Sequence, residues 1–205
     1  MSAWNERVKR AFDLCGSLAG LIITAPILAV VAVLIKLTSR GPVLYRQVRV
    51  GKMGHLFTLF KFRTMNTDNN PAVHKKYVQS LICGKAPAAD GVYKIVNDPR
   101  ITRIGSFLRK TSLDELPQLF NVLMGDMSLV GPRPPIPYEV EVYQPWHHTR
   151  LFVKPGITGL WQVSGRNRTS FSEMVMLDIH YTASFSIWND LKILVKTPLV
   201  MVTGR

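Results

Sequence analysis

The sequence predicts a mostly helical α+β protein with a membrane-inserted helix at its N-terminus. Three observations support this fold class. Residues 14–35 form a run of 22 residues without a charged side chain. Residues 43–50 and 56–62 have the β-branched and aromatic composition of strands, and much of the remaining chain shows helical patterns. We therefore expect a membrane segment over residues 1–40 and a second domain over residues 41–205.

The chain is strongly basic. It has 205 residues, with 26 Lys and Arg against 13 Asp and Glu, and a formal net charge of +13. Such an excess attracts anions, which include nucleic acid, an anionic membrane surface and phosphorylated small molecules. Cys15 and Cys83 form no close pair and no metal-ligand spacing. We therefore expect no disulfide and a reducing compartment.

The apolar run of residues 14–35 is best interpreted as inserted in a membrane. As a straight helix it would cover ~33 Å, about one hydrocarbon core. A core helix of a soluble protein would show a polar face, and this run shows none. A cleaved signal peptide is disfavoured because the run is long and is followed by "KLTSRGP", without a small-residue cleavage pattern.

Pro26 and the flanks of the run leave two topologies open. Pro26 stands near the centre, where proline removes a helix hydrogen bond. Membrane helices tolerate such a kink while crossing, but both flanks are basic, so the positive-inside rule does not orient a crossing. A helix that turns at Pro26 and returns would keep both flanks on one side. The flanking basic residues are Arg7, Lys9 and Arg10 before the run, and Lys36, Arg40, Arg46, Arg49 and Lys52 after it.

The next segment is predicted to be a β-hairpin. Val43–Val50 and Leu56–Phe62 are the two strands, joined by the turn "GKMG". Because side chains alternate between the two faces of a strand, Lys61 and Arg63 are expected on one face, at the exit of the second strand. They mark either an anion-binding edge or a solvated hairpin tip.

Further helices are expected around residues 74–82, over residues 102–110 as an amphipathic helix, and over residues 116–124 ended by Gly125. The proline-rich residues 132–155 are expected to be irregular.

A C-terminal helix over residues 185–202 suits either a membrane interface or packing against the core. Asp178, in another expected helix, is interpreted as the partner of a nearby arginine rather than as a site residue. The five histidines show no metal spacing and are interpreted as structural or exposed.

Asp114 and Glu115 are adjacent acids in a basic neighbourhood. By spacing alone, Ser112 and Glu115 form a capping box at the start of a helix, and acids there complement the helix dipole. The alternative is an anion site at a helix N-terminus. Arg133 stands between two prolines. It belongs either to a turn that the prolines merely stiffen or to a loop that holds its guanidinium in place for a phosphate.

Four stretches of the sequence carry a family resemblance, with the central Pro26 of the apolar run. These are "VKRAFDL", "FKFRTM", "DPRITRIGSFLRKTSLDELPQLFNVLMGDMSLVGPRP" and "KPGITGLWQVSGRN". In this order they resemble the bacterial sugar transferase family, the monotopic polyprenol-phosphate phosphoglycosyl transferases, in the small form that consists of the catalytic unit. The resemblance is weakest over residues 66–96.

The resemblance implies an enzyme and assigns the two acids. Asp114 would be the nucleophile that attacks the β-phosphorus of a UDP-sugar and expels UMP. Polyprenol (undecaprenyl) phosphate would then take the sugar phosphate from Asp114, as a membrane step of surface glycan assembly. Glu115 would bind Mg²⁺. Like-charge repulsion between a carboxylate and a diphosphate has to be neutralised, and the candidates for this work, in order, are Arg133, Arg109, Lys61 and Arg63.

Two further expectations follow from the resemblance. Arg166, in the loop "SGRN", is expected to contact nucleotide or phosphate, with a surface turn as the alternative. The apolar run is expected to be re-entrant, broken at Pro26, with residues 41–205 as a catalytic domain on the cytoplasmic face of the bacterial inner membrane. The family break is usually Ser-Pro, whereas this chain has Ala25-Pro26. Thr24 could supply the missing hydroxyl.

Two rival classes have to be separated from this interpretation. A non-enzymatic basic protein bound to a membrane or to RNA has no use for Asp114 and Glu115, and no nucleic-acid module is recognisable. We therefore expect UDP-sugar, polyprenol phosphate and inner-membrane lipids as partners, and no nucleic acid. A direct-displacement glycosyltransferase would release UDP instead of UMP. The sugar and the oligomeric state, monomer or homo-oligomer, are not decided by the sequence.

Overall fold

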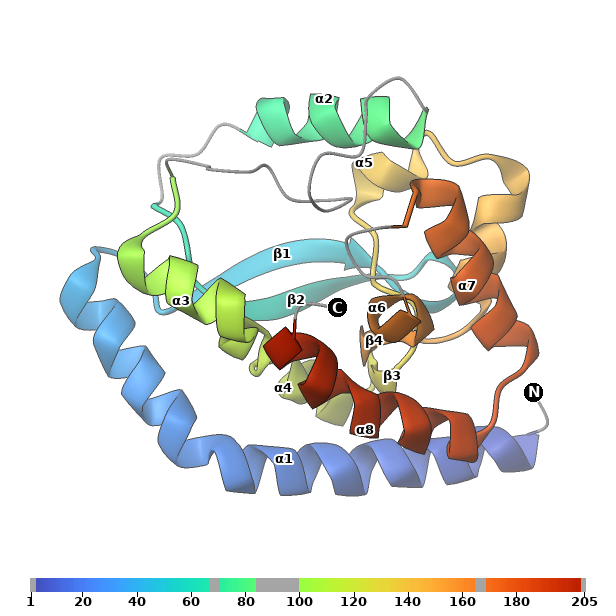
Figure 1. Cartoon of the computed structure of the whole chain (residues 1–205), viewed down its shortest axis with the longest axis horizontal. Coiled ribbons are helices and arrows are strands. Elements are labelled where there is room, and N and C mark those ends of the chain that lie inside the picture. Colours follow the sequence, from blue (N-terminus) through green and yellow to red (C-terminus); the bar gives the residue numbers. More distant parts are fainter. Residues whose placement is uncertain (1–2, 67–70, 84–99, 165–168, 204–205) are drawn as a thin grey trace.

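Helix α1 (Ala3–Thr38) runs along one side of the molecule and changes direction near its middle (Figure 1). The computed structural model describes residues 3–66, 71–83, 100–164 and 169–203. Pro26 lies inside α1, which continues through it as one helix. By length and composition, Trp4–Thr38 could cross a membrane.

The hydroxyl of Thr24 does not replace the hydrogen bond that Pro26 lacks. Proline has no N–H to donate to the carbonyl four residues earlier, which here belongs to Ile22. The Thr24 hydroxyl instead donates to the Gly20 carbonyl at 2.7 Å. Such a bond within one helical turn favours bending, so Thr24 and Pro26 together account for a bend in a continuous helix.

The predicted hairpin is confirmed. Strands β1 (Leu44–Val50) and β2 (Leu56–Phe62) pair antiparallel, joined by the short 3-10 turn η1 (Lys52–Gly54). The register places Tyr45 opposite Lys61. Side chains at every second position then share a face with Lys61, and this set is Tyr45, Gln47, Arg49, Phe57 and Leu59.

Three helices that the sequence predicted are also present. They are α2 (Pro71–Ile82), α3 (Arg103–Thr111) and α4 (Gln118–Met124). The Thr102 side chain accepts a hydrogen bond from the Gly105 N–H at 2.9 Å and so caps the start of α3. Helix α4 ends at Gly125, whose φ of 94° is the left-handed conformation that glycine adopts without strain.

The expectation that residues 132–155 are irregular was wrong in part. This segment contains the short helix α5 (Pro137–Val140) and the 3-10 helix η3 (Pro145–Phe152). Each begins with a proline, at the position where a missing N–H costs nothing and the fixed φ suits a helix. The flanking segments pair as two short parallel strands, β3 (Ser128–Val130) and β4 (Gly156–Thr158), which the sequence did not predict.

The chain ends in helices α6 (Leu160–Ser164), α7 (Phe171–Ala183) and α8 (Ile187–Thr203). Helix α8 fits both interpretations of its sequence. Its inner side buries Asp190 and Ile193, while an apolar stripe on its outer side stays exposed. That stripe comprises Trp188, Leu191, Val195 and Leu199.

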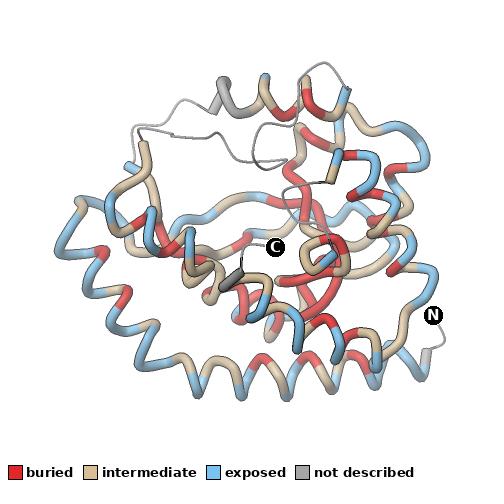
Figure 2. Tube along the Cα trace, in the orientation of Figure 1, coloured by how far each residue is buried: buried red, intermediate tan, exposed pale blue. Residues whose placement is uncertain are grey.

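Buried residues lie along the inner side of α1, around the two small sheets, and between α2, α6 and α7 (Figure 2). One cluster joins the second half of α1 to the hairpin and α3, through Val31, Ile35, Phe62 and Leu108. The largest cluster gathers β2, α4, β3, α7 and α8, and its buried members are Leu59, Leu119, Val122, Met127, Leu129, Val130, Tyr181 and Ile193.

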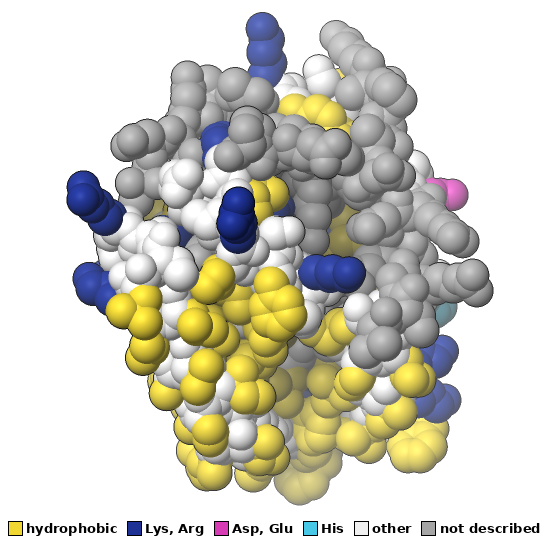
Figure 3. All heavy atoms as spheres, turned by 60° about the vertical axis from the view of Figure 1, so that its left-hand side comes forward, with side chains coloured by type: hydrophobic (Ala, Val, Ile, Leu, Met, Phe, Trp, Pro, Cys, Tyr) yellow, Lys and Arg dark blue, Asp and Glu magenta, His cyan; other side chains and the backbone are white. Residues whose placement is uncertain are grey.

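The outer side of α1 remains apolar and exposed. Figure 3 shows hydrophobic side chains gathered over the lower part of the face that includes the second half of α1, with Lys and Arg side chains above them. Such a contiguous apolar surface beside basic residues is typical of a membrane contact. The exposed apolar residues of this half include Ile27, Val30, Val33, Leu34 and Leu37.

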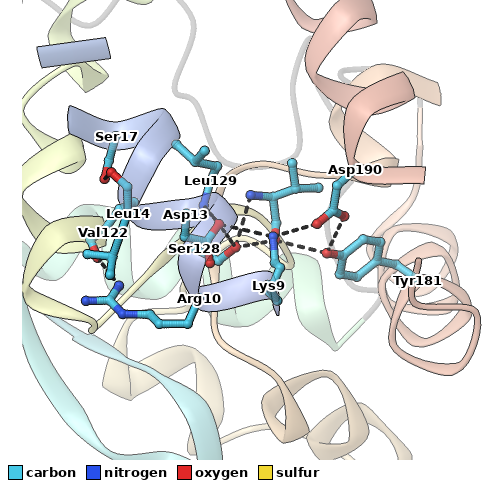
Figure 4. A network of polar contacts seen from close by, with 11 residues as sticks. Lys9, Arg10, Asp13, Leu14, Ser17, Val122, Ser128, Leu129, Tyr181 and Asp190 are labelled. Atoms are coloured by element: carbon cyan, nitrogen blue, oxygen red, sulfur yellow. Dashed lines mark hydrogen bonds and ion pairs between the residues drawn. The ribbon is translucent and has the colours of Figure 1, made fainter. Parts of the chain in front are cut away.

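Buried charges hold the first half of α1 to the rest of the molecule (Figure 4). The Lys9 ammonium lies 3.2 Å from Asp13 Oδ1 and 2.6 Å from Asp190 Oδ2 on α8. Asp13 Oδ1 also accepts hydrogen bonds from the Ser128 hydroxyl at 2.9 Å and the Leu129 N–H at 3.0 Å. We call Lys9, Asp13 and Asp190 the N-terminal clasp.

Arg10 adds a second attachment next to the N-terminal clasp. Its guanidinium donates to the carbonyls of Val122 and Leu123 at 2.6 and 2.7 Å. These carbonyls belong to the last turn of α4, where cations complement the helix dipole. Both ends of α1 are attached, because Arg63 Nη2 donates to the Ser39 carbonyl at 2.9 Å and to its hydroxyl at 2.7 Å.

We predict that Lys9→Met will destabilise the protein, because it leaves the buried carboxylates of Asp13 and Asp190 without their cation. Removing one partner of a buried ion pair typically costs ~3–5 kcal/mol. The matched control is Lys52→Met, since Lys52 forms an exposed pair with Glu6 whose loss should cost less than ~1 kcal/mol. Unfolding of the purified chain in detergent, followed by tryptophan fluorescence, measures both; equal losses would contradict the clasp.

The loss of stability caused by Lys9→Met should also depend on pH. Burial raises the pKa of Asp190, and the Lys9 ammonium opposes that rise. Without Lys9, the folded-state pKa would rise further. A raised folded-state pKa gives stability that is present below the unfolded pKa and lost as the pH rises through the folded one. The deficit should therefore be largest near neutral pH and shrink on acidification.

Candidate functional site

A basic pocket forms where the hairpin, α4, the loop after β3 and α6 meet. Its empty space is about 310 Å³, a volume that includes open solvent. Three cationic side chains and one carboxylate line it. The lining residues are Arg49, Leu59, Lys61, Glu115, Gln118, Arg133, Pro134, Gly156, Ile157 and Gln162.

Lys61 and Glu115, two of the predicted site residues, lie together at this pocket although they belong to separate elements. Lys61 is in β2, and its ammonium lies 2.8 Å from Glu115 Oε1. Their side chains are 25% and 33% exposed, so solvent and ligands can reach both. An anion that binds here can therefore compete with Glu115 for the lysine.

Asp114 is buried and lies one residue before Glu115, in the 3-10 turn η2 (Leu113–Glu115). The predicted capping box is wrong. Ser112 has a φ of 56° and makes no capping hydrogen bond through its side chain, whereas an N-cap residue needs an extended backbone. Helix α3 ends and η2 begins at Ser112, so the chain turns sharply there and Glu115 points to Lys61 instead.

Asn121 joins α4, the helix that follows the two acids, to strand β2 of the hairpin. Its side chain is fully buried in α4. The Oδ1 atom accepts from the Phe60 N–H at 3.0 Å, and Nδ2 donates to the Thr58 carbonyl at 2.7 Å. The asparagine thus takes the place of a neighbouring strand along β2 and holds α4 against the hairpin.

Arg133 lines the pocket from the loop between β3 and α5. Its Nη1 atom donates to Glu139 Oε2 at 3.2 Å, and the Glu139 side chain is completely buried. Pro132 and Pro134 flank Arg133 in this loop, and Arg133 lines the same pocket as Lys61 and Glu115.

Arg49 is a pocket residue that the sequence argument treated only as a basic flank. It is buried, donates from Nη1 to the Pro134 carbonyl at 2.8 Å, and donates from Nη2 to Gln47 Oε1 at 2.6 Å. Burial, and then the neighbouring Arg133 guanidinium, lower its pKa to about 10. Alternation along β1, combined with the hairpin register, would have placed Arg49 on the face of Lys61.

Two amides were missed as well. Gln118 in α4 and Gln162 in α6 both line the pocket. Gln162 donates to the Ile157 carbonyl at 3.3 Å, while its buried Oε1 atom has no hydrogen-bond partner among the described residues. No charge marked these residues in the sequence, and only the fold brings them to the site.

The other predicted site residues lie elsewhere. Arg109 is in the last turn of α3, and its Nη1 atom is buried without a hydrogen bond to the described part of the chain. Arg63 is buried against Ser39 at the end of α1. Neither lines the pocket. Arg166 lies outside the described residues, so its role stays a prediction.

Among the described residues, Glu115 could hold Mg²⁺ together with a phosphate of the substrate. No group of three or more His, Cys, Asp or Glu side chains that could hold a metal occurs within residues 3–66, 71–83, 100–164 and 169–203. Mg²⁺ is commonly held by one or two carboxylates together with substrate phosphates and water. Glu115 at the pocket is a suitable carboxylate, so the donor set fits a metal that arrives with a phosphate ligand.

Two smaller predictions concern residues away from the pocket. Asp178 pairs with Arg150 in the interior, as predicted. His147 is buried, and its Nδ1 atom accepts from the Gln144 N–H at 3.0 Å, which is a structural role.

Comparison with known proteins identifies the family of the chain. The family model "Bacterial sugar transferase" matches residues 4–204. The galactosyl transferase CpsE of Streptococcus agalactiae is 46% identical over 96% of this chain and 42% of its own length. The undecaprenyl-phosphate galactose phosphotransferase of Salmonella typhimurium is 45% identical over 95% of this chain and 40% of its own.

A relative of similar length also matches. The exopolysaccharide production protein PSS of Rhizobium leguminosarum is 42% identical over 96% of this chain and 96% of its own length. The chain thus spans about two fifths of the first two relatives and nearly all of the third. A match over almost the whole chain, at these identities, establishes the family. The chain belongs to the bacterial sugar transferase family.

Proposed function

We propose that the chain transfers a sugar 1-phosphate from a UDP-sugar to undecaprenyl phosphate and releases UMP. The observation that carries the proposal is the turn η2, which puts Glu115 in the lining of a pocket where cations outnumber carboxylates, while Asp114, one residue earlier, is buried and lies outside that lining. A pocket of this charge suits a diphosphate. The relatives' names agree: one of them is the UDP-galactose-lipid carrier transferase of Erwinia amylovora, 45% identical over 93% of this chain.

In the first step, an Asp114 carboxylate oxygen attacks the β-phosphorus of the UDP-sugar. The bond between this phosphorus and the bridging oxygen breaks, and the electron pair leaves with UMP. The sugar phosphate remains on Asp114 as an acyl phosphate. Lys61, Arg133 and Arg49 would offset the negative charge that the diphosphate brings into the pocket.

In the second step, a phosphate oxygen of undecaprenyl phosphate attacks the same phosphorus. The bond to the aspartate oxygen breaks, the Asp114 carboxylate is regenerated, and undecaprenyl diphosphosugar leaves. Two displacements at one phosphorus let a single anion site serve both substrates. Both are anions, which accounts for the net charge of +13 without a nucleic acid partner.

Glu115 is the residue that would hold Mg²⁺. When bound, the metal would neutralise phosphate charge and polarise the phosphoryl oxygens. In the described structure Glu115 pairs with Lys61 at 2.8 Å. Exchange of this lysine for a cation bound with the substrate would free the Lys61 ammonium for a phosphate oxygen.

The attachments of α1 support a re-entrant topology. As a straight helix of 36 residues, α1 would be ~54 Å long. Yet Lys9 near its start and Ser39 just after its end both bind the same folded body. A helix that crossed the bilayer would carry one end away from that body. We therefore propose that α1 dips into the membrane and returns, with the pocket on the cytoplasmic face.

We predict that Asp114→Asn will lower turnover by at least ~10³-fold while the fold is kept, because the amide preserves the shape of the side chain but cannot form the acyl phosphate. UMP release from UDP-galactose and UDP-glucose, with undecaprenyl phosphate in detergent, measures this. Release of UDP instead of UMP would support direct displacement. Absence of turnover with any UDP-sugar in the unaltered protein would favour a non-enzymatic role.

We predict that activity will require a divalent cation. Chelation with EDTA should abolish UMP release and added Mg²⁺ should restore it. Glu115→Gln should raise the Mg²⁺ concentration needed for half-maximal rate, because the amide is a weaker ligand than the carboxylate. Unchanged turnover in rigorously chelated buffer would exclude the metal role.

We predict that Pro26→Leu will shift α1 toward crossing the membrane. A mid-helix proline costs ~3 kcal/mol or more in a straight helix, so its removal stabilises the straight form. A single cysteine at Ser2, in a background without Cys15 and Cys83, reports the side of the N-terminus. An impermeant thiol reagent added outside the inner membrane should label only Pro26→Leu; labelling of the proline form would refute re-entry.

A further inference from the structure

Arg133 and the loop that carries it are held by buried charged groups. Its side chain donates to Glu139 Oε2 at 3.2 Å. Its carbonyl accepts from Arg150 Nη2 at 3.2 Å. The next carbonyl, that of Pro134, accepts from Arg49 Nη1 at 2.8 Å. The backbone of this loop is therefore fixed by two buried arginines, and the guanidinium of Arg133 is bound by the Glu139 carboxylate.

Glu139, like Asp178 and Asp190, is a fully buried acid. It is 0% exposed, in the four-residue helix α5 that packs against β1 and α2. Its Oε1 atom is buried and has no hydrogen-bond partner within the described residues. A fully buried carboxylate with one unsatisfied oxygen is costly to desolvate, so its one contact with Arg133 calls for an explanation.

Two explanations make opposite predictions. If Glu139 only balances the charge of Arg133 and Arg49, its negative charge weakens the attraction of the pocket for a phosphate, and neutralising it should tighten anion binding. If Glu139 holds the Arg133 guanidinium in the direction of the pocket, neutralising it should loosen the arginine and weaken anion binding. The exact position of the guanidinium matters, since misplacing a group in an active site by ~1 Å can lower the reaction rate by ~10²-fold.

We infer that Glu139 is a positioning residue: its buried carboxylate aims Arg133 at the phosphate groups of the nucleotide substrate. The contact with Glu139 leaves Arg133 in the pocket lining and removes rotamer freedom that the arginine would otherwise have to lose on binding. The inference rests on the proposed function for the identity of the anion, and on the geometry alone for the role of Glu139.

The test is the affinity of the full-length protein for UDP, measured by calorimetry without turnover. Glu139→Gln should weaken UDP binding by ~10-fold to ~10²-fold. Glu139→Asp keeps the charge and withdraws it by one methylene, so it should also weaken binding if position matters. The matched control is Glu141→Gln, because Glu141 lies two residues away, is exposed and pairs with Lys75; its UDP affinity should not change.

A double-variant comparison separates positioning from general damage to the fold. If Glu139 acts through Arg133, then Glu139→Gln should change UDP affinity by less than about twofold in an Arg133→Lys background. Melting temperatures of all variants identify unfolded samples, and Glu139→Asp serves as the test if Glu139→Gln does not fold.

Three results would overturn the inference: unchanged or tighter UDP binding in Glu139→Gln, unaltered binding in Glu139→Asp, or losses that multiply in the double variant. These results are independent of the reaction type. A wild-type protein that binds UDP but releases no UMP from UDP-sugars would count against the proposed function alone.

Discussion

In the proposed reaction, the repulsion between the Asp114 carboxylate and a diphosphate is the constraint on which the rest of the site depends. For Asp114 to act as a nucleophile, cations must already surround the phosphates. Those cations must in turn be held in a partly buried pocket before substrate arrives. Lys61 therefore pairs with Glu115, and Arg133 with Glu139. Charge is thus balanced locally at these two cations, whereas Arg49 is bound by neutral groups and the pocket lining as a whole stays positive.

Paired buried charges also attach α1, the helix that we propose enters the membrane. The outer side of α1 is apolar and exposed, but its first half carries the N-terminal clasp on the inner side, where Lys9 joins two buried carboxylates. At the other end, Arg63 closes on Ser39. A re-entrant α1 fixed at both ends would set the height of the pocket above the bilayer, which matters for an enzyme that we propose takes one substrate from water and the other from lipid.

Local patterns predicted much of the fold, and long-range contacts explain the misses. Alternation and the turn "GKMG" gave the hairpin, and Gly125 gave the end of α4. The capping box at Ser112 failed because α3 extends to Thr111, which no local signal required. Arg49 was overlooked because its role depends on strand register and on the loop that carries Arg133. Resemblance to a family directed attention to Asp114 and Glu115, whose spacing alone favoured a cap.

The covalent intermediate is the central claim, and peptide mass spectrometry tests it most directly. The purified chain would be mixed with UDP-galactose in the absence of undecaprenyl phosphate, quenched in acid and digested. The account predicts one peptide, containing Asp114, with the added mass of a hexose phosphate, and loss of this mass when undecaprenyl phosphate is supplied before the quench. Turnover by the same preparation without any modified peptide, or modification at a different residue, would contradict it.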